Sequence, residues 1–385
     1  MIRATLAQAQ HFILQKNYLA NNPAANITDL AKTLAGLPAN PSSTPFLSAW
    51  ARMKNFTPNA LFSALNQNHT LIKSELMRTT PYIIPLEQFV TLHAATARQR
   101  KQAFNAQFRL WGIESNDEME RLGQIALNVL GDEPATLETI TGRVSPKEVR
   151  ELTQTSRGGR VTRTSNVALA LRWLAAEGAL GVSNQAPDWQ QTDTPLYAPL
   201  NYWYPSLKLA NAPTEAEAQK ALVRDYIAAF GPVTEADISF WTGFGKSETA
   251  RATGALSGET TLTMVAGIPG MLLSLKSQAD ALASAGEFAE PIINLLPAND
   301  PYTTAHRASR SRYFADPSLQ RKVFSSSGEV KPTILLNGQI IGLWEWGEQL
   351  NWQLLTGVDP AVVSLIEARL EQTANFLQLD STSQL

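Results

Sequence analysis

The feature that most constrains this chain of 385 residues is the repeated order of its helical and β-rich segments. Apolar residues recur at helical spacing over residues 1–20 and 28–37, and further helices are expected from Thr44 and from Thr57. The stretches TLIKSELMRT and PYIIP then have the length and β-branched content of two short strands. The last three of these helices, followed by the two strands, give the order of a winged helix, a variant of the helix-turn-helix.

The same order recurs twice along the chain. In the second copy, EMERLGQIALNVLG, PATLETITGRV and TSNVALALRWLAAEGAL predict helices, and GVSNQAPDWQQTDTPLYAPL predicts a hairpin. In the third, EAEAQKALVRDYIAAFG, PVTEADISFWTGF and KSETARATGAL predict helices, and TTLTMVAGIPGMLLSL a hairpin. A β-rich pair joined by Asn337-Gly338, which suits a type I′ turn, and a helix from about Pro360 follow. We expect an α+β fold, mainly α, with three tandem winged-helix modules at residues 1–115, 116–210 and 211–385.

Composition excludes several kinds of site. The chain has no cysteine, so disulfides, thiolate metal sites and cysteine nucleophiles are absent, and its four histidines are too scattered to make a metal-binding motif. No apolar run has the length of a membrane helix, and the first residues lack the apolar stretch of a signal peptide. The net charge of −2 gives no general attraction to nucleic acid. We expect a cytoplasmic protein with no metal and no cofactor.

Positive charge nevertheless gathers in three local clusters, ARQRKQ, SRGGRVTRTS and AHRASRSRYF. The second combines arginines and two glycines just ahead of a predicted helix. Glycine lets a phosphate approach the backbone closely, and a helix N-terminus attracts anions, so phosphate is a natural partner. Each cluster is also compatible with ordinary solvated surface. The candidate DNA-binding residues are Arg98, Arg100, Arg157, Arg160, Arg163, Arg307, Arg310 and Arg312.

The stretch LAGLPANPSSTPFLSAWARM joins two predicted helices through Pro38, Ala39 and Asn40. Proline lacks an N–H and disfavours helix at the residue before it, so Pro38 is expected to end the first helix. Thr44 followed by Pro45 predicts the start of the second, with Thr44 as its hydroxyl cap. The turn between them offers one side-chain amide and no group that titrates.

Four further motifs stand in a fixed order: MRTTPYIIP, YIAAFGPVTEADISFWTGF, LLPANDPYTTAHRASRSR and VKPTILLNGQIIGLWEW. They are similar to LRGTLHLVP, GP-x-T-x-x-D-x-x-x-W-x-G, LLP-x-x-DPY followed by arginines, and RPTVLVDGRVVGTW. In this order they resemble the AlkZ-like DNA glycosylases, a winged-helix family that includes YcaQ-type bacterial proteins and antibiotic self-resistance enzymes. With the LAGLPAN stretch, the resemblance spans Leu34 to Trp346.

The resemblance implies three winged helices in a C-shaped arrangement, with a concave groove that binds double-stranded DNA. It also implies hydrolysis of the N-glycosidic bond of alkylated purines, including bulky adducts and crosslinks. The family's catalytic Gln-x-Gln or Gln-x-Asp motif falls on Pro38 and Asn40, so both polar positions have changed here. Arg78 matches an arginine expected to face the DNA backbone or to support the first module, while Tyr82 replaces a histidine.

The altered motif leaves three functions open. The first is a protein that binds duplex DNA on a glycosylase scaffold, with base excision weak or absent because the turn has no catalytic role. The second is an active glycosylase in which Asn40 positions the attacking water. The third is a winged-helix transcriptional regulator, which would usually be a dimer that reads two half-sites. The ordered motifs favour the first two, and a repair protein would act as a monomer on possibly alkylated DNA.

Overall fold

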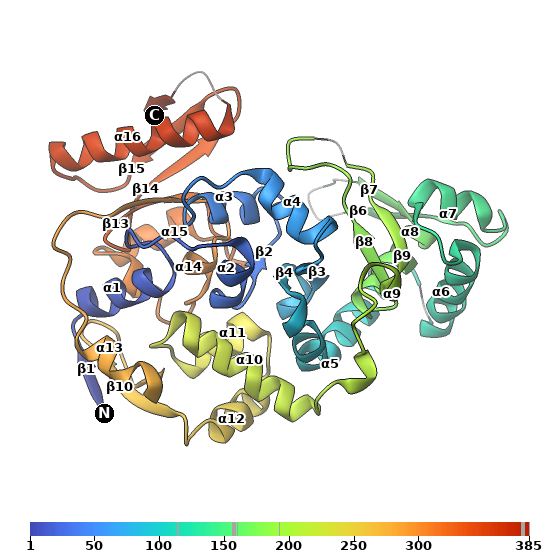
Figure 1. Cartoon of the computed structure of the whole chain (residues 1–385), viewed down its shortest axis with the longest axis horizontal. Helices are drawn as coiled ribbons and strands as arrows, with labels where there is room; N and C mark the ends of the chain where they lie inside the picture. Colours follow the sequence, from blue (N-terminus) through green and yellow to red (C-terminus); the bar gives the residue numbers. More distant parts are fainter. Residues whose placement is uncertain (114, 156–158, 160, 192, 379–381, 385) are drawn as a thin grey trace. The chain divides into compact units, whose positions relative to one another are not determined.

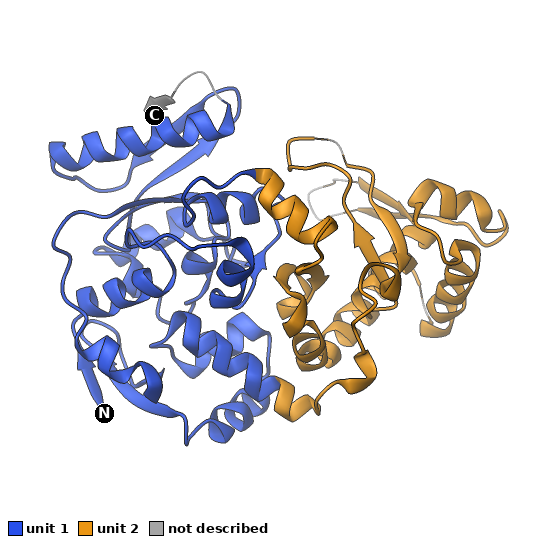
Figure 2. Ribbon diagram, viewed as in Figure 1, with its two compact units in different colours: residues 1–57, 219–385 blue, residues 58–218 orange. Residues whose placement is uncertain are grey.

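The computed structural model describes every residue except 114, 156–158, 160, 192, 379–381 and 385. Helices alternate with short strands along the whole chain, which confirms the predicted α+β class (Figure 1). Two compact units emerge, one made of residues 1–57 and 219–385 and the other of residues 58–218 (Figure 2). Over the residues described, no helix is both long enough and apolar enough to cross a membrane.

The unit of residues 58–218 contains the first and second predicted hairpins. Strand β3 pairs antiparallel with β4, and β8 pairs antiparallel with β9. Strand β9 also pairs antiparallel with β5. Helices α6, α7 and α8 precede β8 and β9, so the predicted order of the second copy is confirmed. The elements are α4 (Pro58–Asn66), β3 (Leu71–Glu75), β4 (Pro81–Pro85), α5 (Leu86–Leu110), α6 (Asn116–Leu130), β5 (Ala135–Thr136), α7 (Leu137–Arg143), β6 (Glu151–Thr155), β7 (Val161–Ser165), α8 (Asn166–Ala176), β8 (Leu180–Ser183), β9 (Leu196–Pro199) and α9 (Leu200–Trp203).

The core of the second copy forms because each helix carries an apolar stripe. Leu122 and Leu130 of α6, Ile140 of α7 and Leu171 of α8 are each at most 2% exposed and belong to one cluster. Burial of such side chains stabilises each by about 1.5–3 kcal/mol relative to exposure. These stripes at a spacing of three and four residues made the helices predictable.

An additional hairpin, β6–β7, carries Arg163 of the second basic cluster. Its strands pair antiparallel from Glu151↔Ser165 to Thr155↔Val161. The sequence did not indicate these strands, because their side chains are largely exposed and polar and so lack the apolar alternation of a half-buried strand. Arg163 therefore belongs to a strand of this hairpin.

The other unit contains the third predicted hairpin and a five-stranded sheet of order β12-β13-β14-β15-β16. Helices α10, α11 and α12 precede the β10–β11 hairpin, so the predicted order of the third copy is confirmed as well. The elements are β1 (Ile2–Ala4), α1 (Leu6–Lys16), α2 (Ile27–Thr33), β2 (Leu37–Pro38), α3 (Thr44–Trp50), α10 (Glu215–Phe230), α11 (Glu235–Thr242), α12 (Lys246–Ala255), β10 (Thr260–Val265), β11 (Leu272–Leu275), α13 (Ala279–Ala283), β12 (Ile293–Leu296), α14 (Pro301–Thr304), α15 (Gln320–Val323), β13 (Thr333–Leu336), β14 (Gln339–Trp346), β15 (Leu350–Leu354), α16 (Pro360–Leu377) and β16 (Thr382–Gln384).

The first residues of the chain are built into this same unit, which also contains residues 219–385. Strand β1 pairs in parallel with β10, with Ile2 opposite Thr263 and Ala4 opposite Val265. Phe12 and Ile13 of α1 are buried in the same cluster as residues of β13 and β14. Residues 1–57 thus pack with the C-terminal half of the chain, and the division into three modules stays a prediction.

The β13–β14 turn has the geometry that its sequence indicates. Asn337 and Gly338 have φ values of 52° and 80°, as a type I′ turn requires. A Cβ atom on Gly338 would lie 2.6 Å from the hydroxyl oxygen of Tyr302, so both φ and close packing favour glycine here. Trp344 of β14 and Trp241 of α11 are buried in the core.

Candidate active-site segment and basic residues

The turn that replaces the family motif begins with the end of α2. Helix α2 ends at Thr33, and the chain then passes through Ala35 at φ 51° and Gly36 at φ 105°. The N–H of Gly36 donates to the carbonyl of Ala31 at 2.8 Å. This bond pairs one of the carbonyl groups that the end of a helix leaves without a partner. The expectation that Pro38 ends this helix was therefore wrong, because the left-handed residues end it earlier and Pro38 lies in strand β2.

Within the Pro-Ala-Asn turn, Pro38 and Ala39 are buried, and Asn40 is exposed. In the described part of the chain, the Asn40 amide group has no hydrogen-bond partner. The backbone carbonyl of Asn40 accepts a hydrogen bond from Nδ2 of Asn299 at 3.1 Å. The turn thus has a fixed backbone and presents one polar side chain to solvent.

Helix α3 follows the turn and is tied to the segment around Asn299. Thr44 was expected to cap this helix, but its hydroxyl donates to the carbonyl of Ala298 at 2.7 Å. Ser43 takes the cap position without a side-chain hydrogen bond, and Pro45 lies in the first turn, as predicted. The Thr44 hydroxyl therefore links two segments distant in sequence and does not cap its own helix.

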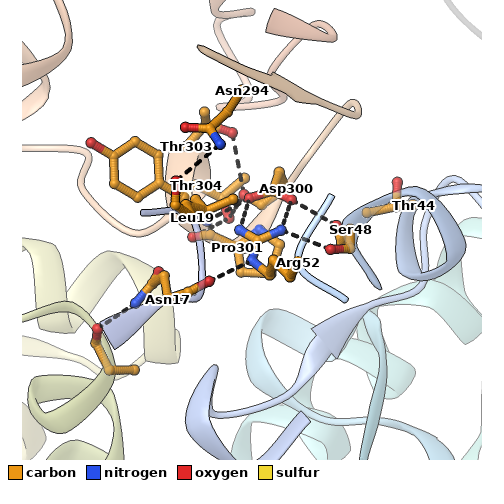
Figure 3. Close-up of polar contacts among 12 residues, drawn as sticks. Asn17, Leu19, Thr44, Ser48, Arg52, Asn294, Asp300, Pro301, Thr303 and Thr304 are labelled. Atoms are coloured by element: carbon orange, nitrogen blue, oxygen red, sulfur yellow. Dashed lines mark hydrogen bonds and ion pairs between the residues drawn. The ribbon is translucent and has the colours of Figure 1, made fainter. Parts of the chain in front are cut away.

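A buried ion pair makes the strongest link between these two segments (Figure 3). Arg52 Nη2 lies 2.7 Å from Oδ1 of Asp300, and Arg52 Nη1 lies 2.8 Å from Oδ2. Both side chains are fully buried. The hydroxyl of Ser48 donates to Oδ2 of Asp300 at 2.7 Å, and Arg52 also donates to the carbonyls of Asn17 and Ser48. A bidentate, fully hydrogen-bonded pair of this kind fixes geometry more strongly than an exposed pair does.

Asp300 also organises the backbone after it. It caps α14 by accepting the N–H of Tyr302 at 2.9 Å, and the preceding Asn299 accepts the N–H of Val330 at 2.8 Å. The motif is therefore a capped turn, and because Asp300 is buried it cannot contact DNA in this structure. Ser48 and Arg52 were missed in the sequence, although Thr44, Ser48 and Arg52 recur at a spacing of four residues along one helical face.

The chemistry open to this segment is narrow. Asp300 is the carboxylate of the network, but it is buried and already accepts hydrogen bonds from Arg52, Ser48 and Tyr302. Asn40 is exposed, and an amide can hold a water molecule but cannot take its proton near neutral pH. The segment therefore has one water-holding group and no available general base among these residues.

A profile of the family described as "DNA glycosylase AlkZ-like" matches residues 31–376, which is most of the chain. The chain belongs to the AlkZ-like DNA glycosylase family. The solved structure of Streptomyces sahachiroi DNA glycosylase AlkZ is similar over 100% of both chains, with a TM-score of 0.76 and 17% identity, and so shows the same fold. No curated protein matches the chain in sequence.

Tyr82 occupies the position where the AlkZ-like motif has histidine. Its side chain is buried, and this burial raises its pKa to about 12, against the opposing charge of Arg78. Arg78 itself is exposed and has a left-handed backbone at φ 56°, followed by Thr79 at φ 53°. Tyr82 therefore cannot act as an acid or a base near neutral pH.

Four of the predicted DNA-binding arginines of this AlkZ-like protein are exposed, namely Arg78, Arg98, Arg163 and Arg307. Arg98 pairs with Glu215 at 3.0 Å, and Arg163 lies 3.9 Å from Glu151. Arg307 stacks on the ring of Phe240 at 4.6 Å, and the half-buried Arg310 lies 3.9 Å from the ring of Phe324. Exposed pairs of this kind are weak, so these cations can still meet a phosphate. Arg157 and Arg160 lie outside the described residues.

Two of the predicted DNA-binding residues are corrected by their burial. Arg100 is 0% exposed and donates to the carbonyl of His93 at 2.8 Å and to the Thr96 hydroxyl at 2.7 Å. Arg312 is 1% exposed and donates to the carbonyl of Pro232 at 3.0 Å and to His306 Nε2 at 2.9 Å. Neither guanidinium can reach a phosphate in this structure. Both satisfy buried acceptors and hold elements of the fold together.

Proposed function

We propose that this protein binds double-stranded DNA on an AlkZ-like glycosylase scaffold and that its excision of alkylated purines is weak or absent. The proposal includes three winged helices around a concave groove, a monomer as the binding form and the cytoplasm as its location. The family membership and the shared fold support the scaffold. The exposed arginines named above support phosphate contacts, which supply most of the affinity of non-specific DNA binding.

One observation carries the proposal of weak excision: the turn at the family's catalytic position presents only the amide of Asn40. Loss of an alkylated purine builds positive charge on the sugar, and a carboxylate stabilises this charge and positions the attacking water. Asn40 can help to position water but brings no negative charge. Pro38 has no polar side-chain atom, and it is buried.

A slow glycosylase is the second candidate, favoured by the exposure of Asn40 and by the fixed backbone beneath it. An N7-alkylated purine carries positive charge and leaves readily, so one well-placed water can support slow excision. The hydrogen bond from Asn299 to the carbonyl of Asn40 holds the turn in one conformation. In this second candidate, the Asn40 amide would hold the water.

The two candidates are separated by excision and binding assays on the same duplexes. The full-length protein is incubated with duplex DNA that contains N7-methylguanine, and released base and DNA binding are both measured. We expect binding with little or no release above the spontaneous rate. Release clearly above the spontaneous rate in the wild type, which falls in Asn40→Ala, would establish the second candidate. Absence of DNA binding at low salt would contradict the proposal as a whole.

A further inference from the structure

A large cavity lies away from the Pro-Ala-Asn turn, and none of the proposed functions uses it. It has a volume of about 860 Å³, within the usual range for ligand sites. Its walls come from residues 18–23, residues 50–56, residues 291–294 and one face of α16, all in the same compact unit. Asn40 does not line it.

The charge of this cavity is unusual for a protein with a net charge of −2. None of the described residues that line it is acidic, whereas Arg52, Lys54 and Arg369 all do so. Asp300 neutralises Arg52, but no carboxylate among the described residues pairs with Lys54 or Arg369. The cavity therefore keeps two uncompensated positive charges.

Arg369 is held in place in a way that suits the binding of an anion. Its guanidinium lies 4.5 Å from the centroid of the Trp50 ring, and Nη1 donates to the side-chain oxygen of Gln372 at 2.9 Å. Trp50 is in turn stacked on Phe376, with ring centroids 5.3 Å apart. Burial lowers the pKa of Arg369 from its usual value, because burial removes part of the solvation of its charge. An anion in the cavity would relieve that cost and would meet a guanidinium already fixed in orientation.

Side-chain amides supply the rest of the polar lining. Asn21, Asn55 and Asn375 are exposed on three separate segments of the wall. An amide both donates and accepts hydrogen bonds, so it pairs well with hydroxyl groups and with neutral heteroatoms. The cavity thus combines cationic groups for an anion with neutral groups for a polar, uncharged part of the same ligand.

We propose that this cavity binds a phosphate ester that carries hydroxyl groups or a nucleobase, with Arg369 and Lys54 on the phosphate and the amides on the remainder. Such a ligand is either a free sugar phosphate or nucleotide, or a nucleotide unit of a DNA strand. The inference does not rest on the proposed excision chemistry.

The test measures binding of defined probes to the full-length protein by calorimetry and by thermal shift. The probes are ribose 5-phosphate, deoxyadenosine monophosphate, a short single-stranded oligonucleotide, and ribose as the uncharged control. We expect the phosphate esters to bind and to raise the melting temperature, and ribose to do neither. Tighter binding of the oligonucleotide than of the mononucleotide assigns the site to a DNA strand, and equal or weaker binding assigns it to a free ester.

Two pairs of variants locate the site. Arg369→Gln should weaken phosphate-ester binding by about tenfold or more, while the exposed Arg321→Gln outside the cavity should leave it unchanged. Ala368→Trp fills the cavity from α16, whereas Ala361→Trp alters the same helix outside the lining, and both alanines are exposed. Only the first should abolish binding. No binding of any phosphate ester, or binding equal in Arg369→Gln and Ala368→Trp to that of the wild type, would overturn the proposal.

Discussion

Arg52 and Asp300 form a bidentate ion pair, 248 positions apart in sequence, with neither side chain open to solvent. The pair connects the residues just after α3 to the N-terminus of α14, and Asn299, which precedes Asp300, donates to the carbonyl of Asn40. The two charges of the pair neutralise each other only while both segments keep their folded positions. This relationship makes the candidate active-site segment dependent on a loop from the C-terminal half of the chain.

Arg52→Met should therefore lower the free energy of unfolding by about 3–5 kcal/mol, because it leaves Asp300 buried without its counter-charge. The measurement is urea unfolding followed by circular dichroism. The double variant Arg52→Met with Asp300→Asn should recover part of the loss, since it removes the unpaired charge. Arg98→Met serves as the control, because its exposed pair with Glu215 should contribute less than about 1 kcal/mol. A loss in Arg52→Met as small as in Arg98→Met would refute this account of the pair.

Asn40→Asp should increase excision of N7-methylguanine over the wild type, because it returns a carboxylate to an exposed position. Groups of this kind typically contribute ~10²–10⁴-fold to rate, so partial rescue should be measurable. Adding Pro38→Gln completes a Gln-x-Asp motif, but Pro38 is buried, so the double variant should also be less stable by about 1–3 kcal/mol. Single-turnover release of the base and thermal unfolding report the two effects. No gain in either variant, with DNA binding intact, would favour a dedicated binding protein whose proposed groove holds no flipped base.

When DNA binding is measured against salt concentration, replacement of an exposed arginine should change the salt dependence, and replacement of a buried arginine should not. Arg163→Ala and Arg307→Ala should each reduce the log–log salt slope by about 0.9, the value for one lost phosphate contact. Arg312→Ala should leave the slope unchanged and lower the melting temperature, because its side chain is buried among protein acceptors. Fluorescence anisotropy with a labelled duplex gives the slope. An unchanged slope in both exposed variants would remove them from the interface.

Stability should fall on mild acidification because two histidines are neutral in the folded protein. Burial and the charge of Arg312 lower the pKa of His306 to about 3, and burial and the charge of Arg100 lower that of His93 to about 4. Both would titrate near 6.5 when unfolded. Below that pH the unfolded state binds protons that the folded state does not. The contribution of the two neutral histidines to the free energy of unfolding is therefore complete above pH 6.5. It is lost as pH falls toward the pKa values that they have in the folded protein.

The expected slope of the unfolding free energy is about 1.4 kcal/mol per pH unit for each histidine, or roughly 2 kcal/mol each between pH 6.5 and 5. Urea unfolding at pH 7.5, 6 and 5 gives the slope. His306→Gln keeps a group that accepts from Arg312 but does not titrate, so it should flatten the dependence by about half. An equally steep dependence in His306→Gln would assign the loss of stability to other groups.

Sequence patterns predicted the elements whose determinants are local. The helices of the second and third copies follow from apolar stripes, and Asn337-Gly338 marks its turn because few other pairs tolerate two positive φ values. Thr234 and Asp237 form a capping box, in which each side chain accepts the backbone N–H of the other. Such interactions span a few residues, so the sequence contains both partners side by side.

The side-chain roles that could not be predicted from the sequence depend on partners that are distant in sequence. Arg100 and Arg163 look alike in sequence, yet one is buried against His93 and the other is exposed on a hairpin. The sequence around Thr44 predicts a helix cap, but in the structure its hydroxyl donates to the carbonyl of Ala298. A polar side chain takes its role from the acceptors around it, and here those acceptors belong to other segments. The candidate turn could be located from sequence, but the ion pair that supports it could not.

The parallel pairing of β1 with β10 also has a consequence for biosynthesis. Residues 2–4 cannot find their partners until residues 263–265 have left the ribosome. At about 5–20 residues per second, this delay is on the order of ten to fifty seconds. Residues 58–218 are complete well before then and can fold first. Until then the N-terminal strand and the apolar face of helix α1 remain without their partners in the nascent chain. Chaperones have time to bind them during this interval.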